Sequence, residues 1–162
     1  LPMVSLDDKV RALAVTAGWK TPRPGQDGSY SFRLEDGLDL KVFSPDGRLC
    51  FLLADLHALP EPGHERDSLL RKVAGQQAGI CRERASVVAL ERQEDAAVRG
   101  LDGERLILQS RVPVDVPQQE FDDAVRDFLN DLAWWKKSLG DSPREELPPM
   151  FSMSGTFFGG VY

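Results

Sequence analysis

The sequence predicts an α+β fold in which a twisted antiparallel sheet packs with three helices. Residues 30–56 alternate apolar and polar side chains and are interrupted by two Asp-Gly turns, which is the strongest short-range signal for β-hairpins. Residues 121–139 instead place large apolar side chains at spacings of four and three, which is typical of an amphipathic helix. The predicted order is α-β-β-β-α-β-β-α, with a three-strand meander followed by two later strands.

Composition limits the classes of function. The chain has 162 residues, a net charge of −6 and 41% hydrophobic residues, which is ordinary for one soluble domain. Its acidic balance argues against nucleic-acid binding and against anionic membranes, which both require a basic surface. No apolar run approaches the length of a membrane span, and charged residues near the N-terminus interrupt any signal peptide. We therefore expect a cytoplasmic protein, with Cys50 and Cys81 as buried free thiols.

The first helix and the meander come first in the chain. Ser5 is a good N-cap for a short helix that Gly18 ends. In the meander, strands near 30–34 and 38–43 alternate, whereas the third strand, 49–56, is apolar on both faces. Such a strand belongs inside a sheet covered on both sides, so a further strand is expected to pair with it.

A second helix is predicted at about 65–82. It contains Gly75 and Gly79, each of which lowers helix propensity by about 1 kcal/mol relative to Ala. One interpretation is a weak helix held by packing. The other, slightly favoured, is a flat face that lets another helix approach closely, for example the same helix of a second subunit.

The remaining elements are two strands and the longest helix. Residues 86–92 predict the fourth strand and 105–113 the fifth, which is the natural partner for the free edge of 49–56. Residues 93–103 stay unassigned apart from a turn at their end. Asp115 is expected to cap the last helix, with Pro117 in its first turn.

The composition changes after Gly140, which ends the last helix. Residues 141–162 form a Pro-containing linker and an apolar tail, so we divide the chain into a folded domain, 1–140, and this segment. A tail this apolar is expected to dock on its own sheet, on a neighbouring subunit or on a partner.

The sequence offers no convincing catalytic or metal site, and we expect no cofactor. His57 and His64 lie in one Pro-rich loop without a recognised ligand spacing, so a solvated loop is favoured over a metal site. Neither cysteine has an obvious base partner, and no nucleophile elbow or phosphate loop occurs. Binding is therefore the expected activity.

The order of elements and three stretches of sequence resemble the class I type III secretion chaperones, the family of the Tir chaperone. The stretches are the hairpin run from Phe32 to Leu38, the turn and strand of residues 101–114, and the last helix with Phe121, Phe128 and Trp135. The resemblance covers residues 5–139. The sequence departs from it in the extra residues between Arg92 and Leu101 and in the apolar tail.

This resemblance implies a homodimer in the bacterial cytoplasm, paired through the second helix and the fourth strand. It also implies that the dimer holds the N-terminal segment of a secreted effector in extended form, without ATP or metal. An extended segment can add to a sheet edge and place alternate side chains in apolar pockets. The candidate effector-binding residues are Leu6, Val10, Leu13, Phe32, Leu34 and Phe43, for which core packing is an equally good explanation, and the candidate dimer residues are Leu69, Val73, Ile80, Val88 and Leu90.

Three alternatives stay open at the level of sequence. A regulatory protein of the same fold would sequester a secretion or transcription regulator instead of escorting an effector. A small enzyme would need a cleft with ionisable groups. A structural subunit would use the tail after residue 140 for assembly.

Overall fold

The computed structural model describes residues 4–34 and 37–140. The predicted order of elements is confirmed, with one short helix added between the last two strands. In chain order the elements are α1 (Leu6–Ala17), β1 (Tyr30–Arg33), β2 (Asp39–Phe43), β3 (Leu49–Ala58), α2 (His64–Ile80), β4 (Val87–Glu91), α3 (Gln93–Val98), β5 (Arg105–Pro113) and α4 (Gln118–Ser138).

The five strands form one antiparallel sheet in the order β1-β2-β3-β5-β4. β5 has the predicted bounds and pairs with β3 along its length, from Leu49 opposite Pro113 to Ala58 opposite Arg105. This confirms β5 as the partner for the free edge of the meander. The two edges of the sheet are therefore β1 and β4.

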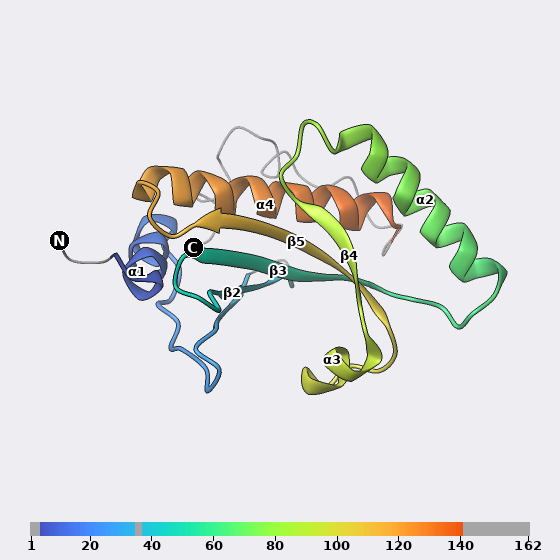
Figure 1. Cartoon of the computed structure of the whole chain (residues 1–162), viewed down its shortest axis with the longest axis horizontal. Coiled ribbons are helices and arrows are strands. Elements are labelled where there is room, and N and C mark those ends of the chain that lie inside the picture. Colours follow the sequence, from blue (N-terminus) through green and yellow to red (C-terminus); the bar gives the residue numbers. More distant parts are fainter. Residues whose placement is uncertain (1–3, 35–36, 141–162) are drawn as a thin grey trace.

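α4 and α1 cover one face of the sheet. On β3, buried Cys50, Leu52 and Ala54 alternate with half-buried Phe51 and Leu53. α4 lies along the buried side, with α1 packed across its first half (Figure 1). The described residues leave much of the opposite face, which we call the open face, uncovered, so the expectation that β3 is covered on both sides is confirmed for the α4 side and stays a prediction for the other. The open face carries Lys41, Phe43, Phe51, Leu53 and Ile107, which register pairing and strand alternation place on one side of the sheet.

The ends of α1 follow the predicted chemistry. The Ser5 hydroxyl accepts a hydrogen bond from the Asp8 backbone N–H at 3.2 Å, and the Asp8 carboxylate accepts from the Ser5 N–H. Gly18 ends the helix with a φ of 71°, a left-handed conformation that glycine adopts without a steric penalty. Lys9 then donates to the Val116 carbonyl and joins α1 to the start of α4.

α4 begins later than predicted. Pro117, with φ −54° and ψ 148°, is the N-cap residue, and Asp115 lies outside the helix. The proline ring fixes a φ suited to this position, so the chain enters the helix directly after it. The predicted apolar stripe is confirmed, because Phe121, Val125, Phe128, Leu132 and Trp135 are all buried.

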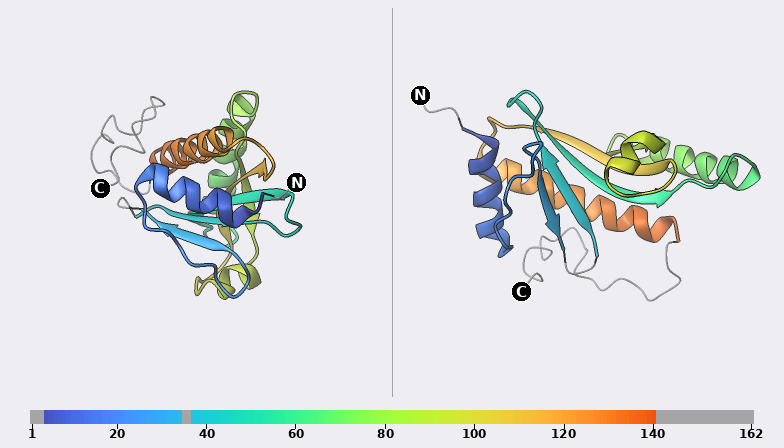
Figure 2. Two further views of the ribbon diagram at one scale, coloured as in Figure 1. Left: turned by 90° about the vertical axis from the view of Figure 1, so that its left-hand side faces the viewer. Right: turned by 90° about the horizontal axis from the view of Figure 1, so that it is seen from below.

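α2 buries far fewer residues than α4. It is 17 residues long, and Val73 is its one buried residue. The helix projects from one end of the molecule, as the views in Figures 1 and 2 show. Among the helices that the structure describes, none combines the length and apolarity needed to cross a membrane.

Candidate interaction surfaces

β1 is an edge strand whose side chains belong to the core. Among the described strands, its backbone pairs with β2 alone. Phe32 packs on Trp19, with ring centroids 5.2 Å apart. The Tyr30 hydroxyl donates to the Asp7 carboxylate at 2.7 Å, and burial, followed by this hydrogen bond, raises the pKa of Tyr30 to about 12. The side chains of this edge are thus held against α1, and none of the described strands pairs with its outer backbone groups.

The predicted effector-binding residues separate into two groups. Val10, Leu13, Phe32 and Leu34 are buried in the hydrophobic core of this chain. Leu6 and Phe43 are half-buried and keep exposed surface. Alternation identifies the apolar face of an element but does not say whether the same chain covers that face. As contact residues all six stay predictions.

The opposite edge of the sheet is partly occupied by its own chain. The backbone N–H of Val88, on β4, donates to the side-chain carbonyl of Gln77 at 2.9 Å. Gln77 lies on α2, so this helix satisfies a donor that an added strand would need. The two edges are therefore chemically different, and β1 is the less obstructed.

The predicted dimer residues lie at one end of the molecule, on α2 and the adjoining β4. Val73 is buried, Leu69, Ile80 and Val88 are half-buried, and Leu90 is 52% exposed. A β-carbon added at Gly75 or Gly79 would meet nothing within 4 Å. No packing within the described chain requires glycine at these two positions.

A buried polar cluster fixes the segment between α2 and β4. Asp131, buried on α4, accepts a hydrogen bond from the Ser86 hydroxyl at 2.6 Å and pairs with Arg84. The Arg84 guanidinium lies 5.1 Å from the ring centroid of Trp134, which packs edge-to-face on Trp135. α4 thereby determines where β4 begins and how α2 leaves the body of the protein.

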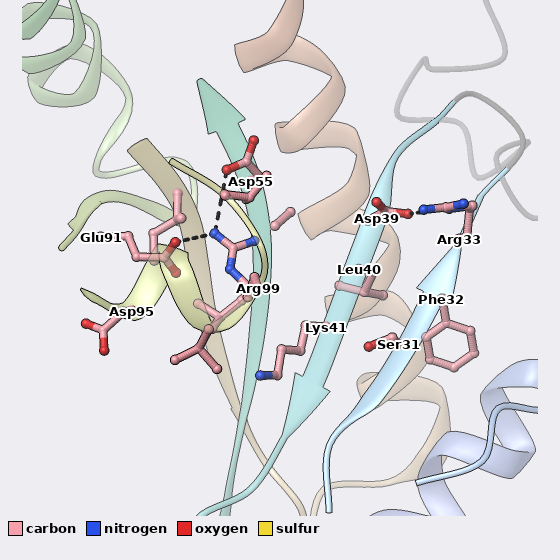
Figure 3. Close-up of a pocket in the computed structure, with 15 residues that line it drawn as sticks. Ser31, Phe32, Arg33, Asp39, Leu40, Lys41, Asp55, Glu91, Asp95 and Arg99 are labelled. Carbon is pink, nitrogen blue, oxygen red and sulfur yellow. Dashed lines mark hydrogen bonds and ion pairs between the residues drawn. The ribbon is translucent and has the colours of Figure 1, made fainter. Parts of the chain in front are cut away.

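A groove of about 710 Å³ lies on the open face beneath α3 (Figure 3). Leu53 and Ile107 from the two central strands form its apolar floor. β1 and β2 line one side, and α3 with the end of β4 lines the other. The side walls are lined by Ser31, Arg33, Asp39, Lys41, Glu91, Asp95, Val98, Arg99 and Leu101.

The charged side chains of the groove mostly pair with one another. Arg99 pairs with Glu91 and lies 3.6 Å from the Asp55 carboxylate, which Arg105 also approaches to 2.6 Å. Across the groove, Arg33 pairs with Asp39 at 3.4 Å. The result is a groove with a balanced charged rim and an apolar floor.

The sequence pattern does not predict this groove, because it assigns no helix or strand to residues 93–103. A signal for α3 was present: Glu94 and Asp95 suit the first turn of a helix, Ala96 and Ala97 follow, and Gly100 is a stop. Six residues are too few for periodicity to show. The residues between Arg92 and Leu101, where the sequence departs from the family pattern, form α3 and one wall of the groove.

Two chemical expectations are corrected by the structure. His57 lies within β3 and His64 begins α2, so the two histidines do not share one loop. Cys81 is exposed, whereas Cys50 is buried, and burial raises the pKa of Cys50 to about 12. Within residues 4–34 and 37–140, no group of three or more His, Cys, Asp or Glu side chains is arranged to hold a metal ion.

Comparisons with known proteins place the fold. No protein-family model matches this sequence, and no curated protein matches it. A chain of the ExsC–ExsE complex has a TM-score of 0.60 at 13% identity, over 83% of this chain and 92% of its own. The HopA1–SchA chaperone–effector complex gives 0.58 at 10% identity, over 85% and 98%. The Yersinia pestis type III secretion chaperone SycH, in complex with a fragment of YscM2, gives 0.51 at 10% identity, over 80% and 98%. The chain therefore has the α+β fold of these solved structures, among them the type III secretion chaperone SycH.

Proposed function

We propose that this protein is a type III secretion chaperone that binds the N-terminal segment of a secreted effector in extended form. The observation that carries the proposal is the shared fold, which spans at least 92% of each of the three compared chains. The compared structures are complexes, one of them a chaperone with its effector. The proposed activity is binding rather than catalysis, and it takes place in the bacterial cytoplasm.

The difference between the two sheet edges supports β1 as the place where the effector segment binds. On β4, the backbone N–H of Val88 is already bonded to Gln77. β1 forms the opposite edge of the sheet, and no described strand lies beyond it. An extended segment on β1 would gain backbone hydrogen bonds, and its alternate side chains would reach the half-buried Phe43 on the open face. Leu6, on α1, offers apolar surface on the helical side. Val10, Leu13, Phe32 and Leu34 would contribute from beneath the surface.

The sparse packing of α2 supports a homodimer through α2 and β4. Most of the stability of a helix in a protein comes from packing of its apolar face, and α2 buries one residue. Exposed Leu90 and the open space around Gly75 and Gly79 lie at the same end. A second copy would cover Leu69, Ile80, Val88 and Leu90 and would explain both glycines.

Light scattering and a defined peptide test the proposal together. We expect the full chain to have twice its sequence mass in solution. The partner that co-purifies from the native bacterium is then identified, and a peptide of its N-terminal segment is expected to bind at one peptide per two chains. A monomer that retains no polypeptide partner would contradict the proposal.

N-methylated peptides test the strand addition itself. Methyl groups on alternate backbone nitrogens remove donors from one edge of the peptide only. We expect one of the two alternating patterns to abolish binding and the other to preserve it. Equal binding of both peptides would exclude a backbone ladder on β1.

A regulatory protein of the same fold would use the same surfaces, and the identity of the partner distinguishes the two functions.

A further inference from the structure

We propose that the groove on the open face is the docking site for residues 150–162 of the same chain. This surface differs from the α2–β4 end proposed for the dimer, and its occupation does not depend on the chaperone function. The groove is defined by Leu53 and Ile107 on its floor and by α3 on one wall.

The groove leaves apolar surface open to solvent. Val98, on α3, is 88% exposed, the highest value among the large hydrophobic side chains in the described part of the chain. Leu53 and Leu101 are half-buried at the same place. Each Å² of apolar surface removed from water contributes about 25 cal/mol, so a segment that covers these side chains is stabilised there.

The charges around the groove favour an uncharged ligand. Its lining contains three cationic residues, Arg33, Lys41 and Arg99, and four anionic residues, Asp39, Asp55, Glu91 and Asp95. Arg33 and Arg99 are paired within the groove, and Lys41 lies 3.4 Å from the Asp27 carboxylate outside it. A nearly balanced set of paired charges provides little field to attract a charged segment.

Residues 150–162 have the matching composition. They contain no Asp, Glu, Lys, Arg or His, and three of them are glycine, which allows close approach of the backbone. Their large apolar side chains are Met150, Phe151, Met153, Phe157, Phe158, Val161 and Tyr162. An uncharged segment with this apolar content suits the floor of the groove, and its serine and threonine hydroxyls suit the polar rim.

A short linker joins the segment to the end of α4. α4 ends on one side of the sheet and α3 lies on the other, and both are toward the same end of the long axis (Figures 1 and 2). Nine residues, 141–149, separate Gly140 from the segment and span up to about 30 Å when extended. A short tether gives an effective concentration in the millimolar range, so the segment would occupy the groove ahead of a dilute external ligand.

Photo-crosslinking in the full chain tests the proposal. Benzoylphenylalanine replaces Phe157, and mass spectrometry locates the crosslinks in an equal mixture of ¹⁵N-labelled and unlabelled chains. We expect crosslinks to Val98, Leu101 and their neighbours, within chains of one isotope. Crosslinks between isotopes would assign the segment to a second copy, and crosslinks confined to α2 or β4, or none, would also overturn the proposal.

Matched variants make the result specific to the groove. Val98→Asp is expected to lower the crosslink yield at least about fivefold, because it places a charge in the apolar wall. Val15→Asp, at a position on α1 that is 78% exposed, is the control and should leave the yield unchanged. Equal effects of the two variants would overturn the proposal.

Hydrogen exchange provides a second readout that needs no crosslinker. The double variant Phe157→Asp and Phe158→Asp is expected to increase amide exchange in α3 at least about threefold, with no change in α1. It changes no residue of the folded domain, so loss of folding does not explain such a result. Unchanged exchange in α3 would contradict docking at this groove.

Discussion

α4 and α2 are the two long helices of the molecule, and they are stabilised in different ways. α4 has 21 residues, of which ten are buried, including Phe121, Phe128 and Trp135. α2 has 17 residues and buries Val73 alone. The conformation of α4 is therefore determined by its own chain, whereas α2 has most of its surface left for something else.

α2 is held by Val73 in the core, by the partly buried Leu69, Leu70 and Ile80 packed against it, and by a few polar contacts. Lys72 donates to the Ser138 carbonyl at 2.7 Å, and Arg66 pairs with Glu104 at 3.1 Å. Gln77 accepts from the Val88 N–H. Partly exposed pairs of this kind contribute about 1 kcal/mol or less each, so they orient α2 more than they stabilise it. The comparison suggests that α2 depends on a partner, which for the proposed function is a second copy.

The largest expected effect contrasts one truncation in each helix. Phe128→Ala should lower the free energy of unfolding by about 3–5 kcal/mol, because it removes a buried ring from the core. Leu69→Ala, at a half-buried site on α2, should lower it by less than about 1.5 kcal/mol when measured on the monomer. Urea unfolding at low protein concentration measures both values, and equal losses would remove the distinction between the helices.

The same contrast explains what the sequence could predict. The Asp-Gly turns that bound the strands and the apolar stripe of α4 are local patterns. The strand pattern after the turn at Asp102-Gly103 predicts β5 at its observed bounds. Such patterns do not report what covers a surface. Strand alternation places Phe32 and Leu34 on one apolar face. Only the packing with α1 and Trp19 shows that this chain buries that face.

The groove was beyond local prediction for a related reason. Its floor comes from β3 and β5, and its walls come from segments about 60 residues apart in the sequence, such as Lys41 and Arg99. Their proximity depends on the register of the whole sheet. A six-residue helix carries too little periodicity to be placed by pattern alone.

The second prediction tests whether the glycines of α2 serve a partner. Gly79→Leu should raise the helix propensity of α2 by about 0.8–1 kcal/mol, and a β-carbon at this position meets no described atom within 4 Å. A helix that approaches this face closely would instead be displaced. We expect a dimer dissociation constant at least about tenfold higher, with unchanged helix content, measured by analytical ultracentrifugation and circular dichroism.

A control and a contradicting result follow from the same helix face. Val15→Leu, on the exposed surface of α1, should leave the dimer unchanged. A Gly79→Leu dimer as tight as the original would show that the glycine face of α2 is not in the interface, while leaving the β4 contribution through Leu90 to be tested separately.

The smallest expected effect concerns a charge that even the well-packed α4 buries. Burial raises the pKa of Asp122 above its ordinary value, and the hydrogen bond from Gln118 offsets part of this rise. The native state then holds a proton that the unfolded state has already lost, so the free energy of unfolding falls as the pH rises from the ordinary pKa through the raised one. Asp122→Asn removes this pH-dependent loss of stability. The asparagine keeps a side-chain oxygen that can accept the 2.8 Å hydrogen bond from the Gln118 side chain. We expect the variant to be more stable at pH 7 by less than about 1 kcal/mol, with the gain shrinking as the pH approaches 4. Urea unfolding at both pH values measures the gain, and a gain that is constant with pH would show that the charge of Asp122 is not its cause.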